Sequence, residues 1–174
     1  MEIWELYDNL RQKTGKTVIR GEYVPDGYYH TVIHVCIFNS NNEMLIQQRQ
    51  PFKRGWSDLW DLSVGGSAVA GESSLLAATR EVKEELGLDI CFEGERPAFT
   101  VQFSFGFDDV YYIDKDTDVT KLELQYQEVK QAKWAAKDEI LKMIDDGSFI
   151  PYYRSFIEFI FDFHNTRDVH EKPE

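Results

Sequence analysis

The sequence predicts one mixed α/β domain, and three observations support this fold class. Segments rich in β-branched and aromatic residues alternate along the chain with segments of helical periodicity. The 174 residues, 43% of them hydrophobic, suffice for one well-covered core and are too few for two ordinary domains. No repeat, linker or low-complexity block interrupts the pattern. We therefore expect a single domain over residues 1–167 and a flexible tail over residues 168–174.

Charge and cysteine content exclude several classes of function. The chain carries 31 acidic and 19 basic residues, a formal charge of -12, without a block of Lys and Arg. Nucleic acid and anionic membranes are therefore not expected as partners. No apolar stretch is long enough to cross a bilayer, and the start lacks the regions of a signal peptide. Cys36 and Cys91 are too few for a disulfide framework and favour a reduced, cytoplasmic setting, with a homodimer left open as the assembly.

The first third of the chain is predicted to contain two hairpins and a short strand. Residues 2–7 and 16–20 have strand character and flank a polar segment, which indicates an edge hairpin. Residues 29–38 and 44–48 follow a Pro-Asp-Gly turn and predict a second, central hairpin. Residues 60–64 predict a short strand that runs into a pair of glycines.

The clearest helix is predicted over residues 73–86. Its apolar residues recur at helical spacing and are expected to face the core: Leu75, Thr79, Val82 and Leu86. Gly87 stands where a C-cap glycine ends a helix.

The last part of the chain is predicted to add a hairpin, a strand and two helices. Residues 99–107 and 110–113 flank Asp108-Asp109, which we interpret as the hairpin turn. Residues 128–135 predict a strand. Residues 137–146 and 152–164 predict the two helices.

Three glutamates on the central helix are the first candidates for chemistry. Glu81, Glu84 and Glu85 are related by three and four residues, so their carboxylates gather on one face, away from the core. Like charges at this spacing repel, and a positive partner should offset the repulsion. The plain alternative is a solvated charged face with an Arg80–Glu84 ion pair.

The loop before the helix favours a metal or phosphate site. Gly66 would let a backbone carbonyl or N–H approach a ligand that a side chain would obstruct. Several hard oxygen ligands suit Mg²⁺ or Mn²⁺, which keep waters and bridge to substrate phosphates. Glu72 could bond to Arg80 and hold the loop against the helix, a structural role for this pair.

The combined pattern resembles the signature of the Nudix hydrolase family. Gly66, Glu72 and the run Arg80-Glu81-Val82-Lys83-Glu84-Glu85-Leu86-Gly87-Leu88 match it at every fixed position. The resemblance implies an α/β/α sandwich with a mixed β-sheet, here with an N-terminal β-hairpin extension. It also implies metal-dependent hydrolysis of a small nucleotide or other organic diphosphate. Glu81, Glu84 and Glu85, with the Gly66 backbone, would bind the metal, and one of these carboxylates or Glu128 would take a proton from the attacking water.

Weaker motifs between residues 2 and 165 resemble the branch of this family related to isopentenyl-diphosphate isomerase. Arg49 and Lys53 match positions that contact diphosphate there, although ordinary surface basicity is the alternative. His30 matches a metal-binding histidine, and either a structural or a substrate-contact role is open to it. Glu128 matches a glutamate of the branch, or belongs to an exposed strand turn.

This chain departs from the isomerases of that branch at two positions, and the departure favours hydrolysis over isomerisation. These isomerases carry a cysteine and a histidine at the positions of Gly65 and Ser67, so the thiol they use is missing here. Cys36 lies on another predicted strand and is expected to be a core residue. An isomerase-like enzyme and a ligand-binding sensor module of the same fold are the alternative functions.

Overall fold

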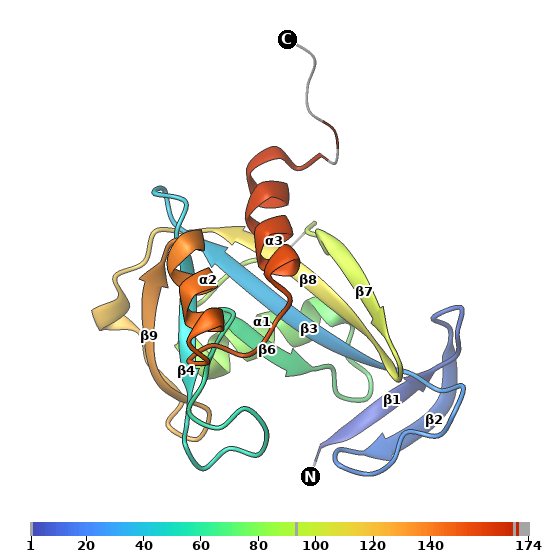
Figure 1. Ribbon diagram of the computed structural model, residues 1–174. Coiled ribbons are helices and arrows are strands. Elements are labelled where there is room, and N and C mark those ends of the chain that lie inside the picture. The colour runs from blue at the N-terminus through green and yellow to red at the C-terminus, as the bar shows by residue number, and fades with distance from the viewer. Residues whose placement is uncertain (1, 93, 169, 171–174) are drawn as a thin grey trace.

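The computed structural model, which describes residues 2–92, 94–168 and 170, is an α/β/α sandwich with a separate N-terminal hairpin (Figure 1). The chain order is β1 (Ile3–Tyr7), β2 (Lys13–Ile19), β3 (His30–Phe38), β4 (Met44–Arg49), β5 (Trp60–Asp61), β6 (Val64–Ser67), α1 (Ser74–Leu86), β7 (Phe99–Phe103), β8 (Gly106–Asp114), the short 3₁₀ helix η1 (Val119–Lys121), β9 (Val129–Ala135), α2 (Lys137–Asp145) and α3 (Arg154–Thr166). The predicted tail lies largely outside the described residues. No helix among those described has the length and apolar content needed to span a bilayer.

The main sheet is mixed and consists of two half-sheets. In one half, β3 pairs in parallel with β8 and antiparallel with β6, and β7 extends β8. In the other half, β4 pairs antiparallel with β5 and β9. β3 and β4 share one paired position, Phe38 opposite Met44, and diverge from there. The predicted central hairpin is therefore present, but its strands separate after the turn and belong to different half-sheets.

Ser63 connects the two halves where they begin to diverge. Its side chain is fully buried, accepts a hydrogen bond from the backbone N–H of Ile37 at 2.8 Å and donates to the carbonyl of Leu45. This bridge interrupts the single strand predicted over residues 60–64. The segment forms β5 on one half-sheet and β6 on the other, because Ser63 between them bonds to both.

Helices cover both faces of the sheet and bury two apolar cores. α1 packs on one face over Ile33, Val35 and Val64, and α2 and α3 pack on the other over Phe38 and Met44 (Figure 1). In α1 the buried apolar residues are Ala77, Ala78, Val82 and Leu86. Leu75 and Thr79 are only partly buried, because the helix turns its two alanines toward the sheet and so approaches it closely.

Both ends of α1 are capped, and the C-cap glycine is the one predicted from the sequence. The side chain of Ser73 accepts a hydrogen bond from the N–H of Leu76, and Gly87 adopts the left-handed conformation at φ 71°.

The predicted turn at Asp108-Asp109 is wrong, since both residues lie within β8 and the β7–β8 turn is at Ser104 and Phe105. Both acidic side chains are instead ion-paired, Asp108 with His34 and Asp109 with Arg11.

The N-terminal hairpin is a separate two-stranded sheet that docks onto the main sheet. It is not an edge strand pair of the main sheet, as the sequence predicted. A short antiparallel bridge between Tyr7 and Tyr29 and a backbone hydrogen bond from Ala70 to the carbonyl of Ile3 attach it to the rest of the domain. Arg11 holds the hairpin through two hydrogen bonds to Asp109, whose side chain is almost fully buried. Trp4 adds a parallel stack on the His30 ring, with centroids 4.1 Å apart.

We expect Arg11→Ala to destabilise the protein and loosen the hairpin. The substitution leaves Asp109 buried with Thr100 as its one side-chain hydrogen-bond partner among the residues that the structure describes. Because Arg11 is 37% exposed, the loss should lie at or below the low end, about 3 kcal/mol, of the range for breaking a buried ion pair. Urea denaturation measures this loss, with Arg96→Ala as an exposed-arginine control. Unchanged stability together with unchanged amide exchange over residues 3–19 would contradict it.

Candidate active site

The helix α1 presents its three glutamates in three different environments. The carboxyl of Glu81 lies directly against Gly66, where any Cβ would collide with it. Glu84 is half exposed. Glu85 is only 5% exposed, and its Oε2 accepts a hydrogen bond of 2.8 Å from Nε2 of Gln47. The prediction that all three face away from the core is therefore wrong for Glu85, which reaches between the half-sheets to β4.

The three glutamates share one small polar pocket of about 80 Å³. Its walls come from α1, from the β6 glycines, from the N-terminal hairpin and from the segment before β9, and its lining residues are Glu2, Arg20, Gly65, Gly66, Arg80, Glu81, Glu84, Glu85, Gln125 and Glu128. The structure thus brings Gly66, Glu81, Glu84, Glu85 and Glu128 together, as the sequence predicted.

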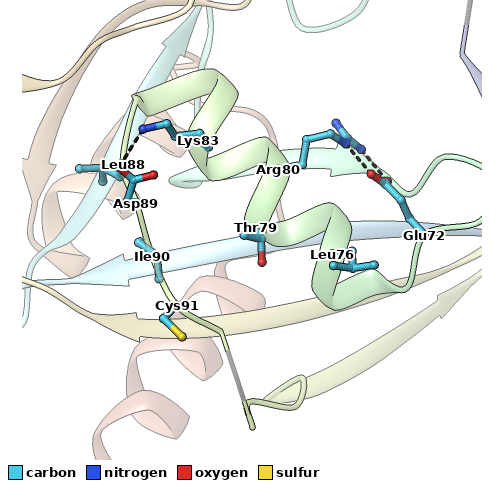
Figure 2. Close-up of a pocket in the computed structure, with 9 residues that line it drawn as sticks. All are labelled: Glu72, Leu76, Thr79, Arg80, Lys83, Leu88, Asp89, Ile90 and Cys91. Atoms are coloured by element: carbon cyan, nitrogen blue, oxygen red, sulfur yellow. Dashed lines mark hydrogen bonds and ion pairs between the residues drawn. The ribbon is translucent and has the colours of Figure 1, made fainter.

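Arg80 fastens the loop to the helix beside this pocket. Its guanidinium bonds to both carboxylate oxygens of Glu72, at 2.8 and 2.9 Å (Figure 2). It donates a further hydrogen bond to the carbonyl of Ser67 at 3.1 Å. It also contacts Glu81 at 2.9 Å and Glu84 at 3.1 Å. The bond to Glu72 raises the pKa of Arg80, and the same bond lowers the pKa of Glu72. The predicted Glu72–Arg80 contact therefore forms, and so does the Arg80–Glu84 ion pair.

Burial makes two of the carboxylates reluctant to carry charge. It raises the pKa of Glu81, although Arg80 opposes the shift. Burial also raises the pKa of Glu85 to about 8, although the hydrogen bond from Gln47 acts to lower it. The nearby carboxylates of Glu81 and Glu128 raise it further. A cation in the pocket would reverse these shifts, because a positive charge favours the ionised carboxylate.

The donor set fits a hard divalent cation, although the side chains do not form a closed cage. Carboxylate oxygens and a backbone carbonyl are the ligands that Mg²⁺ and Mn²⁺ prefer. In the described part of the chain, no three His, Cys, Asp or Glu side chains are close enough to hold a metal ion. Arg80 and Gln47 hold these carboxylates instead.

The remaining predicted residues lie at different distances from the pocket. Lys53 binds the carboxylate of Glu128 at the pocket wall. The Nη1 atom of Arg49 lies 3.9 Å from Oδ2 of Asp61. The Nε atom of Arg49 is buried and has no hydrogen-bond partner among the described residues. His30 is 3% exposed, stacks on Trp4 and is not among the pocket-lining residues, and burial lowers its pKa to about 4.

Several residues of the site were not identified from the sequence. Glu2 and Arg20, paired at 2.7 Å, reach the pocket from the N-terminal hairpin, and Gln125 reaches it from the loop before β9. His34 bonds through Nδ1 to Asp108 at 2.8 Å, beside Gly65. The sequence signal for His34 is its spacing of four residues from His30, which places both on one face of a regular strand. No local pattern marks the hairpin residues.

A larger hollow of about 670 Å³ lies on the outer side of α1 and is a poor candidate for the site. It is lined by Leu76, Thr79, Lys83, Ile90 and Cys91, with the Glu72–Arg80 pair at one end (Figure 2). None of the three clustered glutamates faces it. The polar pocket is therefore the candidate active site.

Comparison with known proteins agrees with this geometry. Residues 28–154 match the NUDIX domain. An uncharacterised Nudix hydrolase of Listeria monocytogenes is 46% identical over 170 residues, covering 98% of this chain and 99% of that protein. The isopentenyl-diphosphate Delta-isomerase of Escherichia coli is 25% identical over 137 residues, covering 76% and 75%. A solved Deinococcus radiodurans structure, 20% identical, superposes with a TM-score of 0.74 over 90% of this chain and 98% of that one, and supports the fold.

We expect His34 to be charged at neutral pH and to stabilise the fold through Asp108. Burial alone would lower its pKa, but the charge and hydrogen bond of Asp108 raise it to about 9. Because this pKa is above the ordinary 6.5, the stabilisation is complete below about pH 6.5 and is lost as the pH rises through about 9.

Asp108→Asn tests this coupling. It should lower the pKa of His34, followed by NMR, and cost about 1.5–3 kcal/mol of unfolding free energy at neutral pH, as for a hydrogen bond to a charged group. The loss should shrink at about pH 10. Asp89→Asn, at a side chain that is 87% exposed, is the control. A loss independent of pH would contradict the ionic coupling.

Proposed function

Because the chain belongs to the Nudix family, we propose that it is a metal-dependent hydrolase that cleaves the diphosphate linkage of a small nucleotide or other organic diphosphate. One observation carries the proposal: Gly66, Glu81, Glu84, Glu85 and Glu128 line one polar pocket. Substrate would bind with its diphosphate in this pocket. A sensor module would have no need of this intact carboxylate set.

The carboxylates and the cations of the pocket would have separate tasks. Glu81, Glu84, Glu85 and the Gly66 carbonyl would hold Mg²⁺ or Mn²⁺, which supplies Lewis-acid polarisation of phosphoryl oxygens and a lower pKa for bound water. Arg80, anchored on Glu72, keeps Glu81 and Glu84 in place. One carboxylate of the set, either on α1 or at Glu128, would accept the proton of the attacking water.

Phosphate oxygens would be bound by the cations around the pocket. Arg20 lines the pocket and pairs with Glu2, and Lys53 pairs with Glu128 of the pocket wall. A phosphate could replace the acidic partner of either cation. Arg49 sits next to this region on β4 with its Nε unpaired in the described chain. A contact of His30 with substrate would require rearrangement of the Trp4 stack, so we assign it to supporting the hairpin.

Isomerisation is not favoured as a second function. Gly65 provides no thiol, and Cys36 is fully buried in the core on the side of α2 and α3. Burial raises the pKa of the Cys36 thiol far above its usual range, which makes it a poor acid–base group. A cytoplasmic location and a homodimer stay predictions from the sequence.

We expect Glu81→Gln and Glu84→Gln each to lower kcat by about two orders of magnitude or more, because each removes a negative charge from the metal-binding set. Released phosphate or nucleotide is measured over a panel of organic diphosphates with Mg²⁺ or Mn²⁺, and a chelator should abolish turnover. Glu139→Gln is the control, since Glu139 is 46% exposed and pairs with Lys133, much as Glu84 pairs with Arg80. Near wild-type rates in both active-site variants would refute the metal assignment.

We expect Lys53→Ala to raise KM about tenfold and to change kcat little. A cation that binds a non-transferred phosphate stabilises the ground state and the transition state about equally. Lys130→Ala is the matched control, because Lys130 also pairs with one carboxylate, that of Asp58, but on the surface. If Lys53→Ala lowers kcat with no change in KM, its task is to position Glu128 and not to bind substrate.

A further inference from the structure

The strand β7 is an edge of the main sheet that carries no charged residue. It pairs with β8 on one side, and on its other side no strand of the described chain pairs with it (Figure 1). Residues 97–107 contain no Asp, Glu, Lys or Arg, although these types make up 29% of the chain. By contrast, β2 carries Lys13 and Lys16, and β9 carries Lys130 and Lys133. Lysines on an edge strand oppose pairing with another chain, so β7 lacks a protection that β2 and β9 have.

The free edge of β7 can accept another strand. In an antiparallel sheet, every second residue of an edge strand directs its N–H and C=O away from the sheet, where a further strand can bind them. The three central residues, Thr100, Val101 and Gln102, are exposed, Val101 to 37%. An exposed, uncharged and partly apolar edge of this kind is expected to be covered by a partner strand.

The sequence of β7 is self-complementary. Read in either direction, Phe99-Thr100-Val101-Gln102-Phe103 has the order aromatic, polar, valine, polar, aromatic. Antiparallel pairing of two copies about Val101 therefore places Phe99 of each copy opposite Phe103 of the other, and Thr100 opposite Gln102. Aromatic pairs and pairs of hydrogen-bonding side chains are favourable across neighbouring strands. A two-fold symmetric contact requires a self-complementary patch, which favours a second copy of this chain over an unrelated partner.

Aromatic rings of α3 extend this patch at the N-terminal end of β7. The ring centroid of Phe159 lies 5.0 Å from that of Phe99, and Phe159 stacks on Phe163 with centroids 5.3 Å apart. Despite these contacts Phe159 is 39% exposed. One end of the strand therefore has an aromatic ring in solvent beside it.

A hollow lined mainly by apolar side chains lies at the opposite end of β7. Phe103 contacts Phe105 with ring centroids 5.0 Å apart, and Phe105 is 50% exposed. Together with Trp4 and Tyr23, Phe105 lines a hollow of about 350 Å³. Antiparallel pairing brings the N-terminal end of one strand to the C-terminal end of the other. The Phe159 ring of each copy would therefore approach the hollow of the other.

We propose that the protein forms a symmetric dimer in which β7 pairs antiparallel with β7 of a second copy, centred on Val101. The main sheet then continues through both copies, and Phe159 of each enters the hollow beside Phe105 of the other. None of the residues named for this interface, apart from any contact made through the hollow, lines the candidate active site, so the dimer does not depend on the proposed function. A five-residue strand is only about 17 Å long, so the contact is smaller than the roughly 800 Å² per partner of a standard interface. We therefore expect a weak dimer, with a Kd on the order of 10 µM.

Sedimentation velocity of the full chain over about 1–200 µM measures the assembly. The wild type should pass from monomer to dimer over this range. Val101→Lys should raise the Kd about 100-fold or more, because it brings two like charges together at the symmetry axis. Gln102→Lys, one residue from the axis, should raise it about tenfold. Gln131→Lys is the matched control, because Gln131 is also an exposed glutamine on an edge strand, β9, and the Kd should not change.

Three results would overturn the proposal. The first is a wild-type chain that stays monomeric at about 200 µM. The second is a dimer whose Kd is unchanged in Val101→Lys, with Gln102→Lys deciding if thermal unfolding shows that the first variant does not fold. The third is growth into larger, open oligomers, because two-fold pairing of β7 closes the contact after two copies.

A cross-link tests the register of the contact. The background is Cys91→Ser, which removes the exposed thiol and leaves the buried Cys36. In this background Val101→Cys places two thiols directly opposite each other, where paired Cα atoms are about 4.5–5.5 Å apart, a separation that a disulfide can span. Oxidised glutathione should convert this variant to a covalent dimer, whereas Gln131→Cys in the same background should stay monomeric. Failure of Val101→Cys to cross-link at a concentration where the wild type is dimeric would overturn the assignment to β7.

Discussion

The organisation of the molecule depends on the single paired position at which β3 and β4 meet. Had the two strands remained paired, the sheet would be continuous and its centre filled by apolar side chains from both faces. Their divergence leaves backbone groups of both strands to be satisfied elsewhere, and Ser63 satisfies one on each side by accepting from Ile37 and donating to Leu45. The space between β6 and β4 is consequently lined by polar groups, and Glu85 reaches into it from α1.

The second constraint is the close contact between α1 and the β6 glycines. Ala77 and Ala78 let the helix approach the sheet, and Gly66 leaves room for the Glu81 carboxyl. Arg80 then holds loop and helix together through Glu72 while it partly neutralises Glu81 and Glu84. Arg80 therefore offsets part of the repulsion within the acidic cluster.

Features encoded by neighbouring residues could be predicted, and those encoded by distant contacts could not. The helix, its C-cap glycine and the gathering of Glu81, Glu84 and Glu85 follow from spacing alone. The burial of Glu85 depends on Gln47, which is 38 residues away. The pair Asp108-Asp109 predicts a turn, because aspartates are common in turns. Inside the strand these side chains are stabilised by distant partners, Asp108 by His34 and Asp109 by Arg11 and Thr100.

The docking of the N-terminal hairpin bears on how this protein could diverge from its relatives. The NUDIX match begins at residue 28, whereas Glu2 and Arg20 of the hairpin form part of the pocket wall. The helix that carries the clustered glutamates and the hairpin that contributes to the pocket wall thus lie in separate segments of the chain. Substitutions in the hairpin can therefore alter the shape and charge of the pocket wall while the sequence of the glutamate-bearing helix stays unchanged.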